Sequence, residues 1–246
     1  MQAVMLAAGM SKRLRPLTDD LPKCLLDIHG KTILDRALEN LIACGFSDFV
    51  IVTGYKAEMI REHVTVHYEN LNVSWFHSDR YFETNNAYSL LLTEEALTGS
   101  FLLLDSDVLF SSDMIKRLLS SSSYPCIALD RHPCSDEEIK VVTDKHDHVV
   151  DIGKHIDPAH AAGESIGFEI FSGSARKELF AVLKRRIRDE KRENEFYEAS
   201  FKEMISAGTE FTAIDTSEFP AMEIDSLSDL ERAKSLLERA DRHHSA

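Results

Sequence analysis

The chain has 246 residues, and its 42 acidic against 28 basic side chains give a net charge of −14. This excess of acid argues against a broad surface for nucleic acid or for anionic membranes, and no apolar run reaches the roughly 18 residues that a bilayer-spanning helix needs. The first apolar residues have no cationic region ahead of them, so we do not expect a signal peptide. The four cysteines have no C-x-x-C spacing, which favours free thiols in a reducing cytoplasm and does not indicate zinc.

The N-terminal half is predicted to alternate between buried strands and helices. Strands are expected at 2–7, 49–53, 73–77 and 101–104. Helices are expected at 32–43, after Gly54-Tyr55 through His63, and at 86–95. Repeated strand–helix–strand units predict an α/β fold with a mostly parallel sheet and helices on both faces. Ligands on such sheets bind at the carboxyl ends of the strands, where Ala8-Gly9, Gly54-Tyr55 and Asp105-Ser106-Asp107 fall.

After residue 120 the predicted strands become shorter. They are expected at 125–130, 139–143, 148–153, 165–172 and 211–215, with helices near 174–192, 195–207 and 227–240. We expect one domain over residues 1–246, and the helices after residue 174 could form the face of a homodimer.

The segment from Leu6 to Lys23 is the first candidate for chemistry. An apolar strand breaks into the small residues Ala7-Ala8-Gly9, and Lys12, Arg13, Arg15 and Lys23 follow closely. Small side chains let backbone N–H groups approach phosphate oxygens, while arginine and lysine neutralise the remaining charge. A helix start with solvated charges is the alternative, but Pro16 and Pro22 predict a rigid loop. The segment is suited to a triphosphate.

A pair of aspartates follows the last predicted strand of the N-terminal half. Alternation along a strand places Asp105 and Asp107 on the same side, where their carboxylates repel each other unless a cation lies between them. Mg²⁺, which prefers oxygen ligands together with phosphate, is the expected cation. The alternative is a capping pair for the helix that begins near Met114, and Asp113 is better placed for that role.

These motifs together resemble those of the nucleotidyltransferases that activate sugar 1-phosphates and small alcohol phosphates. The resemblance lies in Leu6-Ala7-Ala8-Gly9, Arg13-Leu14, Pro16-Leu17-Thr18 and Pro22-Lys23, although Ser11 stands where the family usually has a second glycine. It implies the Rossmann-like fold of nucleotide-diphospho-sugar transferases. The first 120 residues would bind the nucleotide, and 121–240, with the C-terminal helix, would bind the acceptor. It also implies that Arg13 and Lys23 contact the triphosphate and that Asp107 binds the metal.

Two further segments resemble the bacterial phosphocholine cytidylyltransferases. Glu223-Ile224-Asp225-Ser226 is similar to a segment whose aspartate is a metal ligand, which implies that Asp225 joins Asp107; a helix N-cap is the alternative. Asn85-Asn86-Ala87-Tyr88-Ser89-Leu90 is also similar, and its amides could read a pyrimidine and ribose, although asparagine too is common at helix starts. These residues favour CTP as the nucleotide.

The resemblance extends to other binding residues. The nucleotide is expected to contact Leu6, Ala7, Ala8, Gly9, Gly54, Asn85, Asn86 and Asp105. Lys154 resembles the lysine that holds the acceptor's phosphate, which makes it a third catalytic candidate beside Arg13 and Lys23. Lys140, Glu164 and Glu198 are candidates for binding the rest of the acceptor, with a solvated surface position as the alternative for each.

The expected reaction transfers CMP from CTP to a small phosphorylated alcohol with release of pyrophosphate. An ionised acceptor phosphate needs no protein nucleophile, so positioning and charge neutralisation supply the catalysis. A phosphocholine-, inositol phosphate- or phosphonate-like acceptor fits. A sugar-1-phosphate nucleotidyltransferase using UTP or another nucleotide is the main alternative, followed by a glycosyltransferase with an Asp-x-Asp motif and a non-catalytic homologue.

Overall fold

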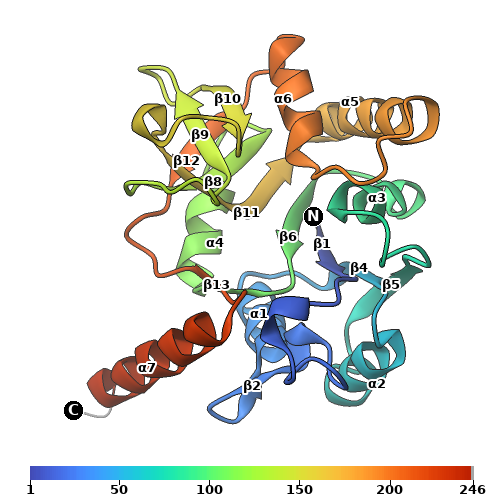
Figure 1. The fold of residues 1–246 in the computed structure, drawn as a ribbon, viewed down its shortest axis with the longest axis vertical. Helices are drawn as coiled ribbons and strands as arrows, with labels where there is room; N and C mark the ends of the chain where they lie inside the picture. The colour runs from blue at the N-terminus through green and yellow to red at the C-terminus, as the bar shows by residue number, and fades with distance from the viewer. Residues whose placement is uncertain (245–246) are drawn as a thin grey trace.

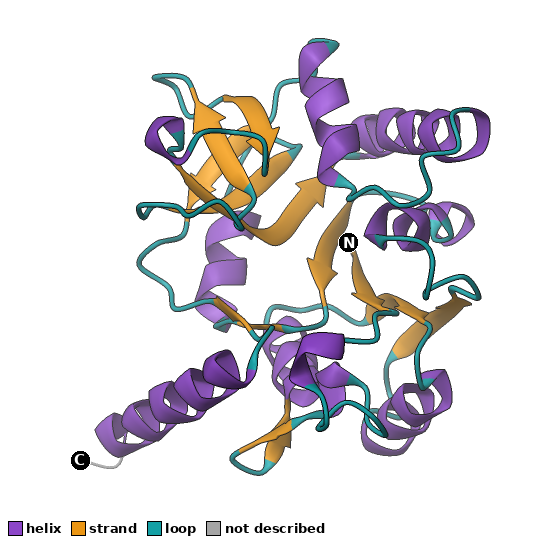
Figure 2. Cartoon of the chain, viewed as in Figure 1, coloured by secondary structure: helices purple, strands orange, loops and turns teal. Residues whose placement is uncertain are grey.

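The computed structural model describes residues 1–244, with side chains up to residue 238. The strands are β1 Gln2–Ala7, β2 Asp27–Ile28, β3 Lys31–Thr32, β4 Asp48–Thr53, β5 Asn72–His77, β6 Phe101–Asp105, β7 Val108–Leu109, β8 Cys126–Asp130, β9 Lys140–Thr143, β10 Val149–Gly153, β11 Gly163–Phe171, β12 Thr212–Asp215 and β13 Met222–Glu223. The α-helices are α1 Ile33–Ala43, α2 Ala57–His67, α3 Asn86–Leu91, α4 Ser112–Leu119, α5 Gly173–Lys184, α6 Glu198–Ser206 and α7 Leu227–His244 (Figures 1 and 2).

A mixed sheet in the order β10-β9-β11-β6-β1-β4-β5 forms the centre of the molecule, with β8 and β12 branching from β11. Strands β6, β1, β4 and β5 are parallel, whereas β11 is antiparallel to β6, β8 and β9. The chain runs from β1 to β4 and β5 on one side and then returns to β6 on the other. This reversal beside β1 is a switch point, where open α/β sheets bind ligands. The predicted α/β fold is confirmed.

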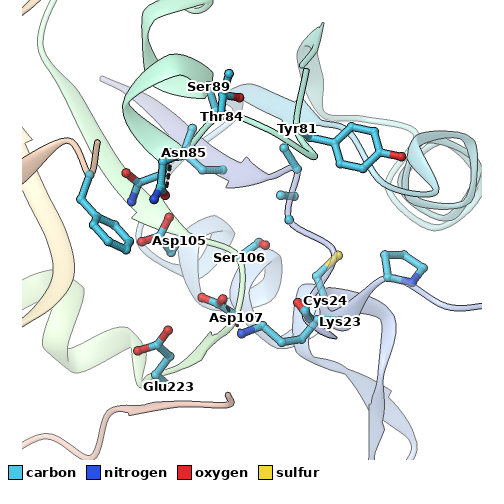
Figure 3. A pocket seen from close by; sticks show the side chains of 18 residues that line it. Lys23, Cys24, Tyr81, Thr84, Asn85, Ser89, Asp105, Ser106, Asp107 and Glu223 are labelled. Carbon is cyan, nitrogen blue, oxygen red and sulfur yellow. Dashed lines mark hydrogen bonds and ion pairs between the residues drawn. The ribbon is translucent and has the colours of Figure 1, made fainter. Parts of the chain in front are cut away.

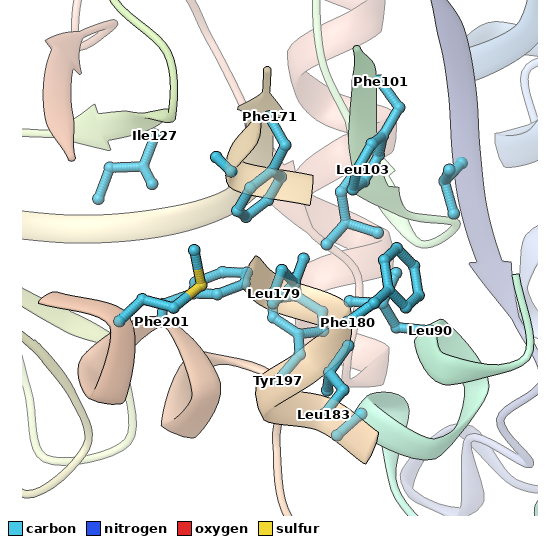
Figure 4. Close-up of a cluster of buried hydrophobic side chains, with 14 of the residues drawn as sticks. Leu90, Phe101, Leu103, Ile127, Phe171, Leu179, Phe180, Leu183, Tyr197 and Phe201 are labelled. Carbon is cyan, nitrogen blue, oxygen red and sulfur yellow. The ribbon is translucent and has the colours of Figure 1, made fainter. Parts of the chain in front are cut away.

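Helices cover both faces of the sheet because β1, β4 and β6 are apolar on both sides. On one face Val4, Leu6 and Leu103 pack in a cluster with residues of α3, α5 and α6 (Figure 4). On the other face Ala3 and Met5 belong to a second cluster, with residues of α1, α2 and α4. Successive side chains of β1 therefore point to opposite faces of the sheet, as in any β-strand.

Local sequence explains where α1 begins. Thr32 accepts a hydrogen bond from the backbone N–H of Asp35, and the Asp35 carboxylate accepts one from the Thr32 N–H, so a complete capping box starts the helix. At its other end Gly45 has a φ of +88°, which favours glycine after a helix. Both boundaries agree with the sequence expectation.

Several expected helices end or begin elsewhere in the structure, and α2 continues to His67, four residues beyond its expected end. Helix α3 ends at Leu91, because the N–H of the buried Thr93 bonds to Leu90 O at 3.0 Å and the chain tightens into a 3₁₀ turn over Glu94–Ala96. Helix α5 ends at Lys184 and passes into a π-helical turn over Arg185–Asp189. Helix α6 begins three residues later than expected, at Glu198, since the preceding loop bonds to the start of α3.

Short strands that the sequence did not predict attach the C-terminal helix. Strand β13 pairs antiparallel with β7, placing Glu223 opposite Val108. Ile224, Leu230 and Ala233 then bury their side chains with Leu14 and Ile28 of the N-terminal segment. Figure 1 shows α7 projecting from the body after this contact. No helix in the described part of the chain is long and apolar enough to cross a membrane.

Candidate active site

A cavity of about 230 Å³ lies at the switch point, between the carboxyl ends of β1 and β6 (Figure 3). Its walls come from the end of β1 and the following loop, the start of α3, the end of β6, and residues near α6 and β13. The lining residues are Leu6, Ala7, Ala8, Gly9, Ser11, Pro22, Lys23, Cys24, Tyr81, Thr84, Asn85, Asn86, Ser89, Asp105, Ser106, Asp107, Phe196 and Glu223. Most of the predicted nucleotide-binding residues therefore surround one cavity.

The loop after β1 is folded tightly by local hydrogen bonds. Ser11, at the position where the resembled family usually has glycine, adopts the left-handed conformation with a φ of 46°. Its carbonyl accepts a hydrogen bond from the Thr18 hydroxyl at 2.9 Å. Pro22 is extended and precedes a 3₁₀ turn over Lys23–Leu25, which turns Lys23 inward until it is only 7% exposed. The loop thus buries one cation and leaves another, Arg13, largely exposed.

Gly54 supports this loop, but it does not line the cavity as we expected of a nucleotide-binding residue. A Cβ atom at Gly54 would lie 2.7 Å from Ala8 O and 2.8 Å from the Cβ of Tyr81. The next residue, Tyr55, donates its N–H to Ala8 O at 3.0 Å and its hydroxyl to Thr18 O at 3.0 Å. The absence of a side chain at Gly54 therefore lets β4 approach the end of β1, and its role is packing.

Lys23 joins the two aspartates that the sequence predicts as metal ligands. Its Nζ lies 2.6 Å from Asp107 Oδ2 and 2.7 Å from Asp225 Oδ1, and Arg13 contacts Asp225 Oδ2 at 2.5 Å. Burial by itself would lower the pKa of Lys23, but the two carboxylates outweigh it and raise the pKa above its usual value. Burial by itself would raise the pKa of Asp225, but the positive charges of Lys23 and Arg13 outweigh it and lower this pKa below its usual range.

The same corner contains a group of three carboxylates suited to a divalent cation. Ligand oxygens of Asp107, Glu223 and Asp225 lie within 4.8 Å of one another. Asp107 Oδ1 is buried and has no hydrogen-bond partner among the described residues, so one acceptor of the group is unused. An all-oxygen donor set of this kind fits Mg²⁺.

Sequence reasoning did not single out Glu223 as a site residue. Burial, with the charges of Asp107 and Asp225, raises the pKa of the Glu223 carboxyl to about 8. Its place depends on the β7–β13 pairing and on the hydrogen bond from Ile224 N–H to Asp107 O at 3.0 Å. The alternation Glu-Ile-Asp was the one available signal, since it puts two carboxylates on one side of an extended segment.

Asn85 and Asn86 line the cavity, and both also hold the backbone. Asn85 is the N-cap of α3 and accepts a hydrogen bond from Asn86 N–H at 2.8 Å. Asn86 Oδ1 accepts one from the N–H of Tyr197 at 3.0 Å, which ties the start of α3 to the start of α6. The capping alternative is therefore correct for Asn85. Because both residues also line the cavity, they stay candidates for binding the nucleotide.

The structure contradicts the role expected for Lys140. It was predicted to bind the acceptor, yet its side chain is fully buried and its ammonium donates to the backbone carbonyls of Ser135, Asp136 and Glu138 at 3.0–3.2 Å. All three N–H groups of an ammonium are then used. Lys140 holds together the loop between β8 and β9, and it is not available to a ligand in this structure.

The remaining acceptor candidates lie outside the cavity lining. Lys154 is exposed, and its Nζ lies 5.5 Å from the ring centroid of Phe196, which does line the cavity. Glu164 is 3.2 Å from Nε2 of His132, and burial raises the pKa of its carboxyl. Glu198 is buried, and burial raises its pKa to about 7.

The chain is similar in sequence to known proteins. Residues 3–199 match the model of the MobA-like NTP transferase domain. A UTP–glucose-1-phosphate uridylyltransferase of Haloferax volcanii is 37% identical over 120 residues, covering 48% of this chain and 49% of the relative. A choline-phosphate cytidylyltransferase of Streptococcus pneumoniae is 32% identical over 146 residues, covering 59% and 61%. The chain thus spans about half to three fifths of the length of these curated relatives.

Solved structures share the fold over nearly the whole chain. The inositol-1-phosphate CTP transferase of T. maritima has a TM-score of 0.79 at 22% identity and covers 95% of this chain and 94% of its own. The phosphocholine cytidylyltransferase of Streptococcus pneumoniae has a TM-score of 0.80 at 22% identity and covers 96% and 98%.

Proposed function

The chain belongs to the MobA-like NTP transferase family, and on that premise we propose that it transfers CMP from CTP to a small phosphorylated alcohol. The observation that carries the proposal is the convergence of Arg13 and Lys23 with Asp107, Glu223 and Asp225 at one end of a cavity beside the switch point. The two cations can neutralise phosphate charge directly, and the carboxylates would do so through a divalent cation that they bind.

In the proposed reaction, an oxygen of the acceptor's phosphate attacks the α-phosphorus of CTP and pyrophosphate leaves. The new P–O bond replaces the bond to the β-phosphate, and the electron pair departs with pyrophosphate. Lys23 and Arg13 would stabilise the negative charge on the leaving group, and Lys154, at the rim beside Phe196, would hold the acceptor. Asp107, Glu223 and Asp225 would hold Mg²⁺, which supplies positive charge at the reacting phosphates.

Several observations support CTP as the nucleotide. Asn85 and Asn86 present amides to the cavity, and relatives named as cytidylyltransferases are similar to this chain. A uridylyltransferase is similar as well, so UTP is the second candidate.

An Asp-x-Asp glycosyltransferase would have no use for two cations beside a triphosphate loop. The free state of all four cysteines supports a location in the reducing cytoplasm, and the homodimer stays a prediction.

A pyrophosphate-release screen tests the proposal. Each of four nucleoside triphosphates is combined with phosphorylated alcohols, sugar phosphates, inositol phosphate and phosphonates in the presence of Mg²⁺. We expect release with CTP and a small phosphorylated alcohol, and a loss of about a hundredfold or more in the Asp107→Asn variant. The exposed Asp113, six residues away on α4, provides the matched control, and Asp113→Asn should retain activity. Near-normal turnover in Asp107→Asn would contradict the mechanism.

A further inference from the structure

A second group of candidate metal ligands lies in the loop between β8 and β9. One ligand atom from each of His132, Cys134 and Glu138 lies within 4.8 Å of the other two, and all three residues are half-buried. None of them belongs to the lining of the cavity. The group therefore consists of other residues, and of other donor atoms, than the three carboxylates beside Lys23.

The ring of His132 is held as a metal-binding histidine usually is. Its Nδ1 lies 3.1 Å from the carbonyl oxygen of Pro133. Because a carbonyl oxygen can only accept a hydrogen bond, Nδ1 carries a proton, and Nε2 is the nitrogen that can bind a metal. Histidines that bind metals commonly donate their other N–H to such a carbonyl, which fixes the orientation of the ring.

Negative charge faces Nε2 of His132. This atom lies 3.2 Å from Glu164 Oε2 and 3.9 Å from Asp130 Oδ2. Carboxylate oxygens accept and do not donate, so a cation is needed at Nε2, and either a proton or a metal ion meets that need. A proton on Nε2 gives no reason for a thiol and a further carboxylate, from Cys134 and Glu138, to converge on the same point. A divalent metal ion accounts for all of these groups.

The loop that carries the ligands is fixed by its own hydrogen bonds. The buried ammonium of Lys140 donates to the carbonyls of Ser135, Asp136 and Glu138. The Glu138 carboxylate in turn accepts a hydrogen bond from the N–H of Ser135 at 2.6 Å, which orients its oxygens. The backbone between the ligands is thus ordered without a metal, and a metal that binds there has little ordering cost to overcome.

We propose that His132, Cys134 and Glu138 bind Zn²⁺ or a similar transition-metal ion, with Glu164 as the nearest candidate for a fourth ligand. One nitrogen, one thiolate sulfur and carboxylate oxygen are donors that Zn²⁺ takes in a tetrahedral site, whereas Mg²⁺ prefers oxygen alone. The spacing His-x-Cys-x-x-x-Glu differs from the C-x-x-C pattern whose absence gave no indication of zinc in the sequence.

The role assigned to this metal is structural. Glu164 belongs to β11, so a shared ion would join the loop after β8 to the central sheet. The site lies outside the cavity lining, and the proposal does not depend on the proposed reaction.

Co²⁺ is the probe for this site, because it takes the same ligands as Zn²⁺ and a bound thiolate gives it a strong charge-transfer absorption in the near ultraviolet. The full chain, with reduced thiols and without nucleotide, is titrated with Co²⁺. We expect the thiolate band to saturate at about one Co²⁺ per chain. Zn²⁺ should abolish the band, and excess Mg²⁺ should leave it unchanged.

Variants locate the bound metal. In Cys134→Ser the charge-transfer band should disappear, and in His132→Gln the affinity for Co²⁺ should fall by about tenfold or more. Cys44→Ser removes another half-buried free thiol and should keep the band. Asp107→Asn should keep it as well, since Asp107 belongs to the other group of ligands.

Thermal unfolding gives a second measurement. Zn²⁺ at one hundred times its Kd should raise the Tm of the wild-type protein by about 5–10 °C, and that of Cys134→Ser by much less. The Tm without metal verifies that each variant is folded.

Two results would overturn the metal site: no thiolate band in the wild-type protein at saturating Co²⁺, or an equal band in Cys134→Ser. Neither measurement uses a substrate. A failed pyrophosphate-release screen would therefore refute the proposed function and leave this site standing, and the loss of this site would leave the proposed function standing.

Discussion

Replacing Lys23 by methionine should destabilise the protein and at the same time improve its response to a divalent cation. The ammonium of Lys23 lies 2.6 Å from Asp107 and 2.7 Å from Asp225, with its side chain 8% exposed and the two carboxylates 21% and 28% exposed. Methionine keeps most of the volume and removes the charge. The carboxylates of Asp107 and Asp225 are then left without the cation that they share, next to Glu223, whose own pKa is raised.

The size of the destabilisation in Lys23→Met follows from the burial of the ion pairs. Removing one member of a buried ion pair costs about 3–5 kcal/mol, and the partial exposure of the carboxylates favours the lower end, about 3 kcal/mol. For a chain of this length that loss corresponds to a fall in Tm of about 6–12 °C. A divalent cation bound by the freed carboxylates would restore about 2.7 kcal/mol at a concentration one hundred times its Kd.

The assay is thermal unfolding without nucleotide, over a series of Mn²⁺ or Mg²⁺ concentrations, supported by calorimetric measurement of metal affinity. In the wild-type protein Lys23 competes with the metal for Asp107 and Asp225, so the Lys23→Met variant should bind the metal more tightly and gain more stability from it. Lys145→Met, at an exposed turn, controls for the loss of one positive charge. Equal metal responses in wild type and Lys23→Met would refute the competition.

Two further predictions concern the buried acid and the loop packing. The pKa of Glu198 is about 7 in the folded protein against an ordinary value of 4.5, so its contribution to stability is complete below pH 4.5 and is lost as the pH rises through 7. That loss is about 3 kcal/mol, and the Glu198→Gln variant should show a correspondingly flatter dependence of unfolding free energy on pH between 4.5 and 7. Gly54→Ala should lower both stability and CTP affinity, because the new Cβ would lie 2.7 Å from Ala8 O and push β4 away from the loop. We expect about 1–3 kcal/mol in urea unfolding and a matching rise in Kd by calorimetry.

Each of these has a clear contrary result. Parallel pH profiles for wild type and Glu198→Gln would show that this carboxyl ionises normally in the folded state. Gly99→Ala is the control for the glycine substitution, since a Cβ there meets nothing within 4 Å. A Gly54→Ala variant as stable as Gly99→Ala would show that the close approach to Ala8 is not required.

The sequence predicted most of the fold because the decisive signals are local. Helix α1 begins at a capping box whose partners, Thr32 and Asp35, are three residues apart. Strands β1, β4 and β6 of the parallel half are largely apolar runs, as expected where helices cover both faces. Helix ends were less well predicted. The late start of α6 depends on a hydrogen bond between Tyr197 and Asn86, which no window around residue 198 contains.

The sequence likewise predicted only part of the candidate site. Arg13, Lys23, Asp107 and Asp225 are recognisable in the sequence, each within a short motif, and the structure brings them together. The roles of Gly54 and Lys140 were not recognisable, since a lysine that donates to three backbone carbonyls has the same sequence signal as one that holds a phosphate.

By itself, then, the amino-acid sequence determined the strand–helix alternation, the phosphate-suited loop and the two separate acidic motifs. Only the tertiary structure decided that Lys23 meets Asp225, which is 202 residues away, and that Glu223 joins them through the β7–β13 pairing. It also decided that the carboxyl groups of Glu169 and Glu198 are buried. The physical reason is that burial and shared partners, which set the charge of a carboxyl, arise only when distant segments pack against one another.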